Sequence, residues 1–174
     1  MSYFVTGGTG FIGRYLVEKL LGRGETIYLL MQEKSMERYE ALLEKLGASK
    51  DDIVAITGTL TEPNLGISAA DLKKLKGKVD HFYHLAAIYD LSASAEIQQA
   101  VNVEGTRNAV NAAEAMKAGC FHQVSSIAAA GLYKGTFRED MFKEATKLDN
   151  PYLLTKHESE KLVREECKIP FRIY

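Results

Sequence analysis

The sequence has little of what marks secreted, membrane-spanning or nucleic-acid-binding proteins. Cysteine occurs twice, and Cys120 and Cys167 have neither metal-ligand nor redox spacing, so we expect two reduced thiols in a cytoplasmic protein. Basic and acidic residues nearly balance, with a formal net charge of −1, which argues against a nucleic-acid partner. No apolar run approaches the roughly 20 residues that span a bilayer, and no signal peptide is recognisable at the start of the chain.

Short apolar runs alternate with amphipathic segments along the chain, whose 174 residues are about one domain. This alternation predicts an α/β protein with a doubly wound parallel sheet, a Rossmann fold, over residues 1–174. The expected strands are Tyr3–Thr6, Thr26–Met31, Ile53–Thr57, Val79–Leu85, Phe121–Ser125 and Ile169–Tyr174. The expected helices are Phe11–Gly22, Met36–Leu46, a short one capped by Ser68, Ala95–Lys117 and Pro151–Cys167. Gly58–Ile67 and Ile127–Asn150 are expected to be irregular.

A glycine-rich turn joins the first expected strand to the first expected helix. Gly7 permits a tight turn, Gly10 lets the backbone approach a pyrophosphate, and Gly13 lets the helix pack closely on the strand. The start of the helix then offers unpaired N–H groups and a partial positive charge to phosphates. We expect a dinucleotide to bind here, in contact also with Thr9, Phe11 and Ile12.

A Tyr-x-x-x-Lys motif opens the last expected helix. Tyr152 and Lys156 are four residues apart, so they share a helical face and the ammonium group stabilises the phenolate. Their place after the fifth strand predicts a catalytic pair, with Lys156 also bonding the nicotinamide ribose. Ser126 ends the fifth strand, at the sheet edge where open α/β sheets bind ligands, and is the expected donor to the reacting oxygen. A serine that merely caps a turn is the alternative.

Metal binding is not expected from the histidines. His81 and His84 lie three apart on a strand and should face opposite ways. His122 and His157 are interpreted as surface or packing residues. Asn102 on the long helix has either a structural or a proton-relay role.

The Gly-x-x-Gly-x-x-Gly spacing and the Tyr-x-x-x-Lys motif resemble those of extended short-chain dehydrogenases/reductases. The segments 60–67, 84–91, 137–142 and 150–174 resemble fatty acyl-CoA and thioester reductases of the male-sterility type, the last most closely the bacterial enzymes that make fatty alcohols. The resemblance implies NADPH-dependent reduction of a fatty acyl-CoA, or another acyl thioester, to an aldehyde, and it leaves open whether the aldehyde or an alcohol is the final product. It supports Ser126 as the catalytic serine, because the family's catalytic serine or threonine lies five residues before a glycine, as Ser126 does before Gly131. It also implies that Ala86 and Ala87 leave room for the cofactor.

The sequence departs from the family pattern at the adenosine end of the expected cofactor site. Gln32 stands where related reductases often have arginine, and Thr59, followed by Leu60, stands where they often have aspartate. Arg14 is a candidate for the missing positive charge. The resemblance favours NADP(H), with NAD(H) as the alternative. Family members also continue into a substrate-binding region, which we expect to be absent from this chain.

Two other functions share these motifs. One is an NAD-dependent epimerase or dehydratase acting on a nucleotide sugar, and the other is a non-catalytic NADP(H)-binding module. The patterns are also compatible with a homo-oligomer.

Overall fold

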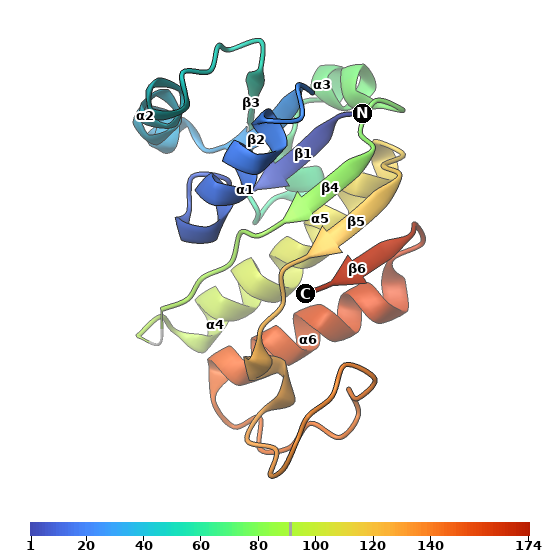
Figure 1. Ribbon diagram of the computed structural model, residues 1–174. Coiled ribbons are helices and arrows are strands. Elements are labelled where there is room, and N and C mark those ends of the chain that lie inside the picture. The colour runs from blue at the N-terminus through green and yellow to red at the C-terminus, as the bar shows by residue number, and fades with distance from the viewer. Residues whose placement is uncertain (91) are drawn as a thin grey trace.

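Six parallel strands form one sheet at the centre of the molecule, as the computed structural model of residues 1–90 and 92–174 shows (Figure 1). The strand order is β3-β2-β1-β4-β5-β6. This order reverses direction between β1 and β4, which is the doubly wound arrangement expected from the sequence. The strands are β1 (Tyr3–Thr6), β2 (Ile27–Met31), β3 (Ile53–Thr57), β4 (His81–His84), β5 (Cys120–Gln123) and β6 (Phe171–Ile173).

Helices cover both faces of this sheet. They are α1 (Phe11–Leu21), α2 (Met36–Leu46), α3 (Ala69–Leu75), α4 (Ala95–Gln98), α5 (Gly105–Ala115) and α6 (Pro151–Glu166). Ser68 caps α3 as expected, its side chain accepting from the Asp71 N–H. Asn150 caps α6 in the same way, and Pro151 occupies the first helical position, where its missing N–H costs nothing. No helix in the described ranges is both long and apolar enough to cross a membrane.

The prediction of a single helix over Ala95–Lys117 is wrong, because the segment is not one continuous α-helix. A π-helical segment, η3 (Gln99–Glu104), separates α4 from α5. Hydrophobic periodicity does not reveal such an insertion, because the apolar face continues on either side of it. Short 3₁₀ turns also occupy parts of the segments expected to be irregular, as η2 (Pro63–Gly66) and η4 (Ile127–Ala130), and a further turn, η1 (Glu33–Ser35), precedes α2.

Two hydrophobic cores lie on opposite faces of the sheet. Phe4, Phe82 and Phe121 stack across β1, β4 and β5 on the face covered by α5 and α6. Val5 and Leu29 belong to the other core, with residues of α1 and α2. Successive residues of a strand therefore point into opposite cores, and both are buried. This is why the strand sequences are nearly continuous apolar runs.

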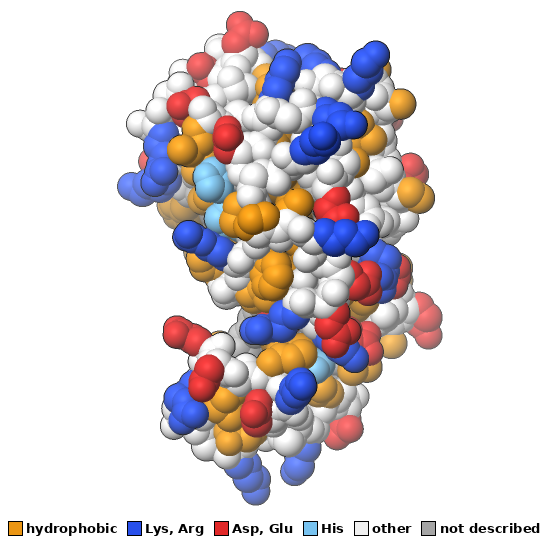
Figure 2. All heavy atoms as spheres, turned by 90° about the vertical axis from the view of Figure 1, so that its right-hand side faces the viewer, with side chains coloured by type: hydrophobic (Ala, Val, Ile, Leu, Met, Phe, Trp, Pro, Cys, Tyr) orange, Lys and Arg blue, Asp and Glu red, His pale blue; other side chains and the backbone are white. Residues whose placement is uncertain are grey.

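The surface mixes charges of both signs. Figure 2 shows lysine and arginine interspersed with aspartate and glutamate on the visible side. The carboxyl ends of the strands and the loops that follow them form the edge at which the candidate site lies.

Candidate active site

The glycine turn between β1 and α1 brings the backbone of three segments into contact. Gly7 has φ 74°, and a Cβ there would lie 2.7 Å from the Ala86 nitrogen. A Cβ on Gly13 would clash with the Gly7 carbonyl oxygen. Any side chain at either position would thus push α1 away from β1 or Gly7 away from the segment after β4. Gly10 precedes the first turn of α1 without a side-chain cap, so the amides at that end remain available to an anion.

A cleft of about 990 Å³ opens along this edge of the sheet. It runs from the glycine turn past the ends of β2 and β3 and along the segment after β4. Its lining includes eleven of the residues expected to bind cofactor, which are Gly7, Thr9, Gly10, Phe11, Ile12, Gly13, Gln32, Thr59, Leu60, Ala86 and Ala87. The cleft lies at the switch point of the sheet, it includes the uncapped start of α1, and Gly7 and Gly13 leave no room for a Cβ. These features together fit a dinucleotide.

The adenosine end of the cleft holds cations that sequence reasoning missed. Gln32 donates from Nε2 to Thr59 Oγ1 at 3.3 Å, so these two residues bond each other. Lys34 and Arg38 line the cleft beside them, with Ser35. Neither cation forms a salt bridge within residues 1–90 and 92–174. Lys34 and Arg38 are four residues apart just after β2, and residues at that spacing in a helical segment lie on the same side. This spacing is the feature of the sequence that could have identified them as a pair of cations.

Arg14, the other cation expected at this site, packs on two aromatic rings of α1. Its guanidinium carbon is 5.2 Å from the ring centroid of Phe11 and 5.0 Å from that of Tyr15, a cation–π arrangement. Phe11 lines the cleft, whereas Arg14 itself is not among the described residues that line it.

Tyr152 and Lys156 reach the other end of the cleft from α6. The Tyr152 ring is edge-on to Tyr89, with centroids 5.2 Å apart. Lys156 is 5% exposed and donates from Nζ to the Val124 carbonyl at 3.2 Å. Tyr89 and Val124 both line the cleft, so the pair adjoins it through these two neighbours. Burial lowers the pKa of Lys156, and the nearby Glu160 carboxylate opposes that shift.

Two consecutive serines at the end of β5 have different partners. Ser125 donates to Glu160 Oε2 at 2.6 Å and is therefore committed to a structural contact. Ser126 Oγ accepts from the Ala128 N–H at 3.1 Å and caps η4. The capping role weighed as an alternative is thus present, but accepting one N–H leaves the Ser126 hydroxyl proton free to donate. Of the two, Ser126 is the one with a proton to give to a ligand.

A buried hydrogen-bond chain behind the cleft was not foreseen from the sequence. Thr106 donates from Oγ1 to the Asn102 carbonyl at 2.6 Å, so its oxygen is left to accept from His84 Nε2 at 3.1 Å. Thr6 Oγ1 accepts from the Ala86 N–H and lies 2.8 Å from His84 Nδ1. Donors and acceptors balance only when His84 is neutral with its proton on Nε2.

Burial agrees with this assignment. Desolvation, with a smaller contribution from the Lys156 charge, lowers the pKa of His84 to about 3. The ring therefore stays neutral across the physiological pH range. Through its hydrogen bonds to Thr6 and Thr106, it connects the end of β1 and the Ala86 backbone to the π segment. His81 points the other way, as expected, and stacks on Tyr3.

Asn102 has a structural role in the π segment. Its Oδ1 accepts from the Ile88 N–H at 2.8 Å, and its Nδ2 donates to the Ile88 carbonyl at 3.2 Å and to Thr155 Oγ1 at 3.3 Å. One amide thereby fixes the segment after β4 to α6, next to Tyr152 and Lys156. The π geometry aims this side chain inward, consistent with the frequent occurrence of such insertions at functional sites.

Comparison with known proteins agrees with this geometry. The sequence profile of the male sterility protein family matches residues 5–174. Fatty acyl-CoA reductase 1 of Mus musculus is 29% identical over 132 residues, which cover 67% of this chain and 26% of that protein. The chain thus spans about a quarter of that relative.

Two solved structures are similar over 99% of this chain. The terminal R domain from the myxalamid PKS-NRPS biosynthetic pathway has a TM-score of 0.83 and 29% identity, and the match covers 47% of it. UDP-glucuronic acid 4-epimerase from Bacillus cereus, in complex with UDP-glucuronic acid and NAD, has a TM-score of 0.74 and 26% identity over 55% of its chain. The chain therefore belongs to the male sterility protein family of NAD(P)-dependent oxidoreductases, within the extended short-chain dehydrogenases/reductases.

Proposed function

We propose that this protein uses NADPH to reduce a fatty acyl thioester, such as an acyl-CoA, to an aldehyde and by a second reduction to an alcohol. One observation carries the proposal. The cleft that fits a dinucleotide ends at Tyr89 and Val124, and these residues contact Tyr152 and Lys156 respectively. A hydride donor bound along the cleft would thus meet a phenol and an ammonium at its reacting end.

The residues at that end suit reduction of a carbonyl. The bound nicotinamide cofactor would supply a hydride to the carbonyl carbon of the thioester. Ser126 and Tyr152 would donate hydrogen bonds to the carbonyl oxygen as it gains negative charge. Breaking the carbon–sulfur bond then releases a thiolate, which takes a proton and leaves as thiol. In the second reduction, the alkoxide formed from the aldehyde would take the Tyr152 proton to give the alcohol. Lys156, held by Val124, would bond the ribose and favour the phenolate that Tyr152 then becomes.

Lys34 and Arg38 support the choice of NADPH. A ribose 2′-phosphate is a dianion at neutral pH, and cationic side chains are what recognise it in dinucleotide-binding folds. The departures at Gln32 and Thr59 remove one arginine and one carboxylate from the expected pattern. Loss of the carboxylate removes a group that would repel the phosphate, whereas loss of the arginine removes a positive charge, which Lys34 and Arg38 would supply instead.

Replacing Tyr152 by phenylalanine tests the chemistry. We expect Tyr152→Phe to lower the rate of NADPH oxidation with palmitoyl-CoA by at least about 100-fold, because a positioned proton donor contributes about that factor. Its NADPH affinity should stay within about twofold, since that substitution removes no charge or helix contact. The assay follows NADPH absorbance and free thiol together. Tyr133→Phe is the matched control, because Tyr133 contacts Phe137 in the segment before α6.

Full activity in Tyr152→Phe would contradict the catalytic assignment. The similarity to a nucleotide-sugar epimerase makes epimerisation the second candidate. An epimerase would hold NAD tightly and show no net consumption of NADPH. Cofactor binding without turnover of either substrate class would indicate a binding module instead.

A further inference from the structure

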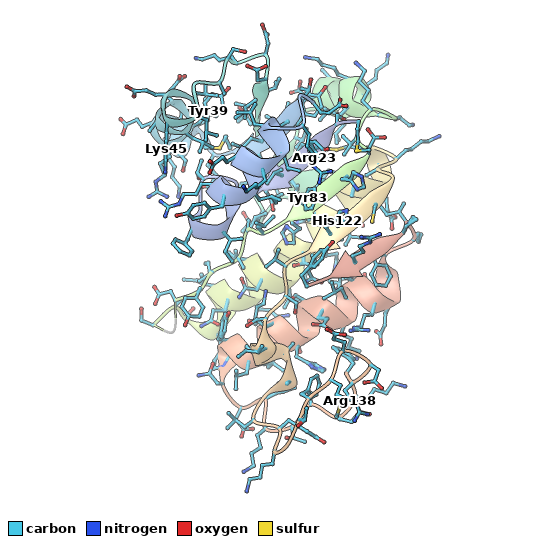
Figure 3. The ribbon with its side chains drawn as sticks, in the orientation of Figure 1. Arg23, Tyr39, Lys45, Tyr83, His122 and Arg138 are labelled. Atoms are coloured by element: carbon cyan, nitrogen blue, oxygen red, sulfur yellow. The ribbon has the colours of Figure 1, made fainter. Side chains whose placement is uncertain are left out.

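A second cluster of chemically competent side chains lies at the amino-terminal ends of β4 and β5. His81 and Cys120 are the first residues of these strands and are paired in register, and His122 follows two residues later on the same face. One nitrogen of each histidine and the Cys120 sulfur all lie within 4.8 Å of one another. Figure 3 labels His122 beside Tyr83 on this face of the sheet. The cofactor cleft lies at the opposite edge, so the cluster takes no part in the proposed reaction.

We propose that His81, Cys120 and His122 form a Zn²⁺ site. Two imidazoles and one thiolate are ligands that zinc prefers, and three protein ligands leave a fourth position for water. His81 Nδ1 and His122 Nε2 are 2.9 Å apart. Two nitrogens bound tetrahedrally at about 2.0–2.1 Å from one zinc ion would be about 3.3 Å apart. The histidines are therefore within a few tenths of an ångström of the required separation.

A neighbouring hydroxyl orients the central ligand. His122 Nδ1 is 2.9 Å from the hydroxyl oxygen of Tyr174, and the two rings stack. When Nδ1–H donates to Tyr174, Nε2 presents its lone pair toward His81 and Cys120. Zinc-bound histidines are usually held by such a contact on the other nitrogen.

Access and charge balance also fit zinc. His81 and Cys120 are half-buried, which leaves the ion a path from solvent. On binding, the sulfur–hydrogen bond of Cys120 would break and its proton would pass to water, while both histidines bind as neutral rings. No oxidant or reductant is needed. The ion would link the ends of β4 and β5, so its effect would be on stability.

Zinc titration of the 174-residue chain tests the site. After treatment with a chelator, the protein competes for Zn²⁺ with a chromophoric chelator of known affinity. We expect one Zn²⁺ per chain at micromolar or tighter affinity, and a loss of at least about tenfold in Cys120→Ser and in His81→Asn. Cys167→Ser is the matched control, because it removes the other thiol and should bind as the original chain does.

Cobalt gives a second readout. Co²⁺ in the same site should produce a thiolate-to-metal charge-transfer band that disappears in Cys120→Ser and persists in Cys167→Ser. Circular dichroism confirms that each variant is folded. The site is absent if Cys120→Ser binds Zn²⁺ as tightly as Cys167→Ser, or if the original chain shows no binding at micromolar Zn²⁺.

Discussion

Lys34 and Arg38 line the cleft beside Gln32 and Thr59, where we propose that the adenosine end of the cofactor binds. Arg14 follows the glycine turn directly, but its guanidinium packs on the rings of Phe11 and Tyr15 and it is not among the described residues that line the cleft. Lys34 and Arg38 come from the segment after β2, which turns back over the cleft.

Removing these two cations should change the choice of cofactor. We expect Lys34→Ala/Arg38→Ala to weaken NADPH binding by at least about tenfold, since one hydrogen bond to a charged group contributes about 1.5 kcal/mol or more. NADH lacks the 2′-phosphate, so its affinity should change by less than about twofold. Fluorescence titration with each cofactor measures both. Lys45→Ala is the matched control, because Lys45 lies in the last turn of α2 (Figure 3). An unchanged ratio of the two affinities would contradict the assignment.

The π segment joins the cleft-lining segment after β4 to α6, the helix that carries Tyr152 and Lys156. Its Asn102 side chain holds both backbone groups of Ile88 and contacts Thr155 on α6. Its Asn102 carbonyl accepts from Thr106, which in turn bonds His84. A regular α-helix through residues 99–104 would rotate these groups by part of a turn and break the contacts. The element therefore sets the position of Tyr152 relative to the cleft.

Truncating Asn102 should loosen this connection. We expect Asn102→Ala to lower the free energy of unfolding by about 1–3 kcal/mol, because the buried polar groups of Ile88 lose their partner. Activity should fall as well, since Tyr152 is held through the same contacts. Urea unfolding measures the first effect. Asn111→Ala, on the exposed side of α5, is the control and should change stability by less than about 0.5 kcal/mol. Equal losses in the two variants would show that Asn102 has no special role.

At the scale of the whole molecule, two buried histidines, His84 and His122, make stability depend on pH. The pKa of His84 in the folded chain is about 3, below its ordinary value of 6.5. As pH falls below 6.5, the unfolded chain binds a proton that the folded chain does not, so stability decreases with falling pH until about pH 3. His122, with a pKa of about 4, acts in the same direction. We therefore expect these two histidines to make the molecule more stable at neutral pH than in mild acid.

Unfolding experiments across this range check the sign and size of the effect. We expect the free energy of unfolding to fall by up to about 1.4 kcal/mol per pH unit for each buried histidine between pH 6 and 4. NMR of the ring nitrogens should show His84 as the Nε2–H tautomer, with no titration above pH 5. A His84 ring that titrates near its ordinary value would refute both the hydrogen-bond chain and its contribution to stability.

The sequence by itself determined the architecture and most of the cleft. Its alternating apolar runs specify strands buried on both faces, and the spacing of the glycines at 7, 10 and 13 indicates a tight turn between a strand and a helix. The structure adds the contacts that exclude a side chain at Gly7 and Gly13. Tyr152 and Lys156 followed from helical spacing, and Asn150 and Pro151 mark where that helix begins.

Only the tertiary structure decided which distant side chains meet. His81 and His122 are 41 residues apart in the sequence and 2.9 Å apart across two strands. The chain from Thr6 through His84 to Thr106 likewise depends on strand register and on a π insertion that periodicity does not reveal. The physical reason is that local patterns record the conformation of a segment, whereas contacts between segments depend on how strands pair and where helices end.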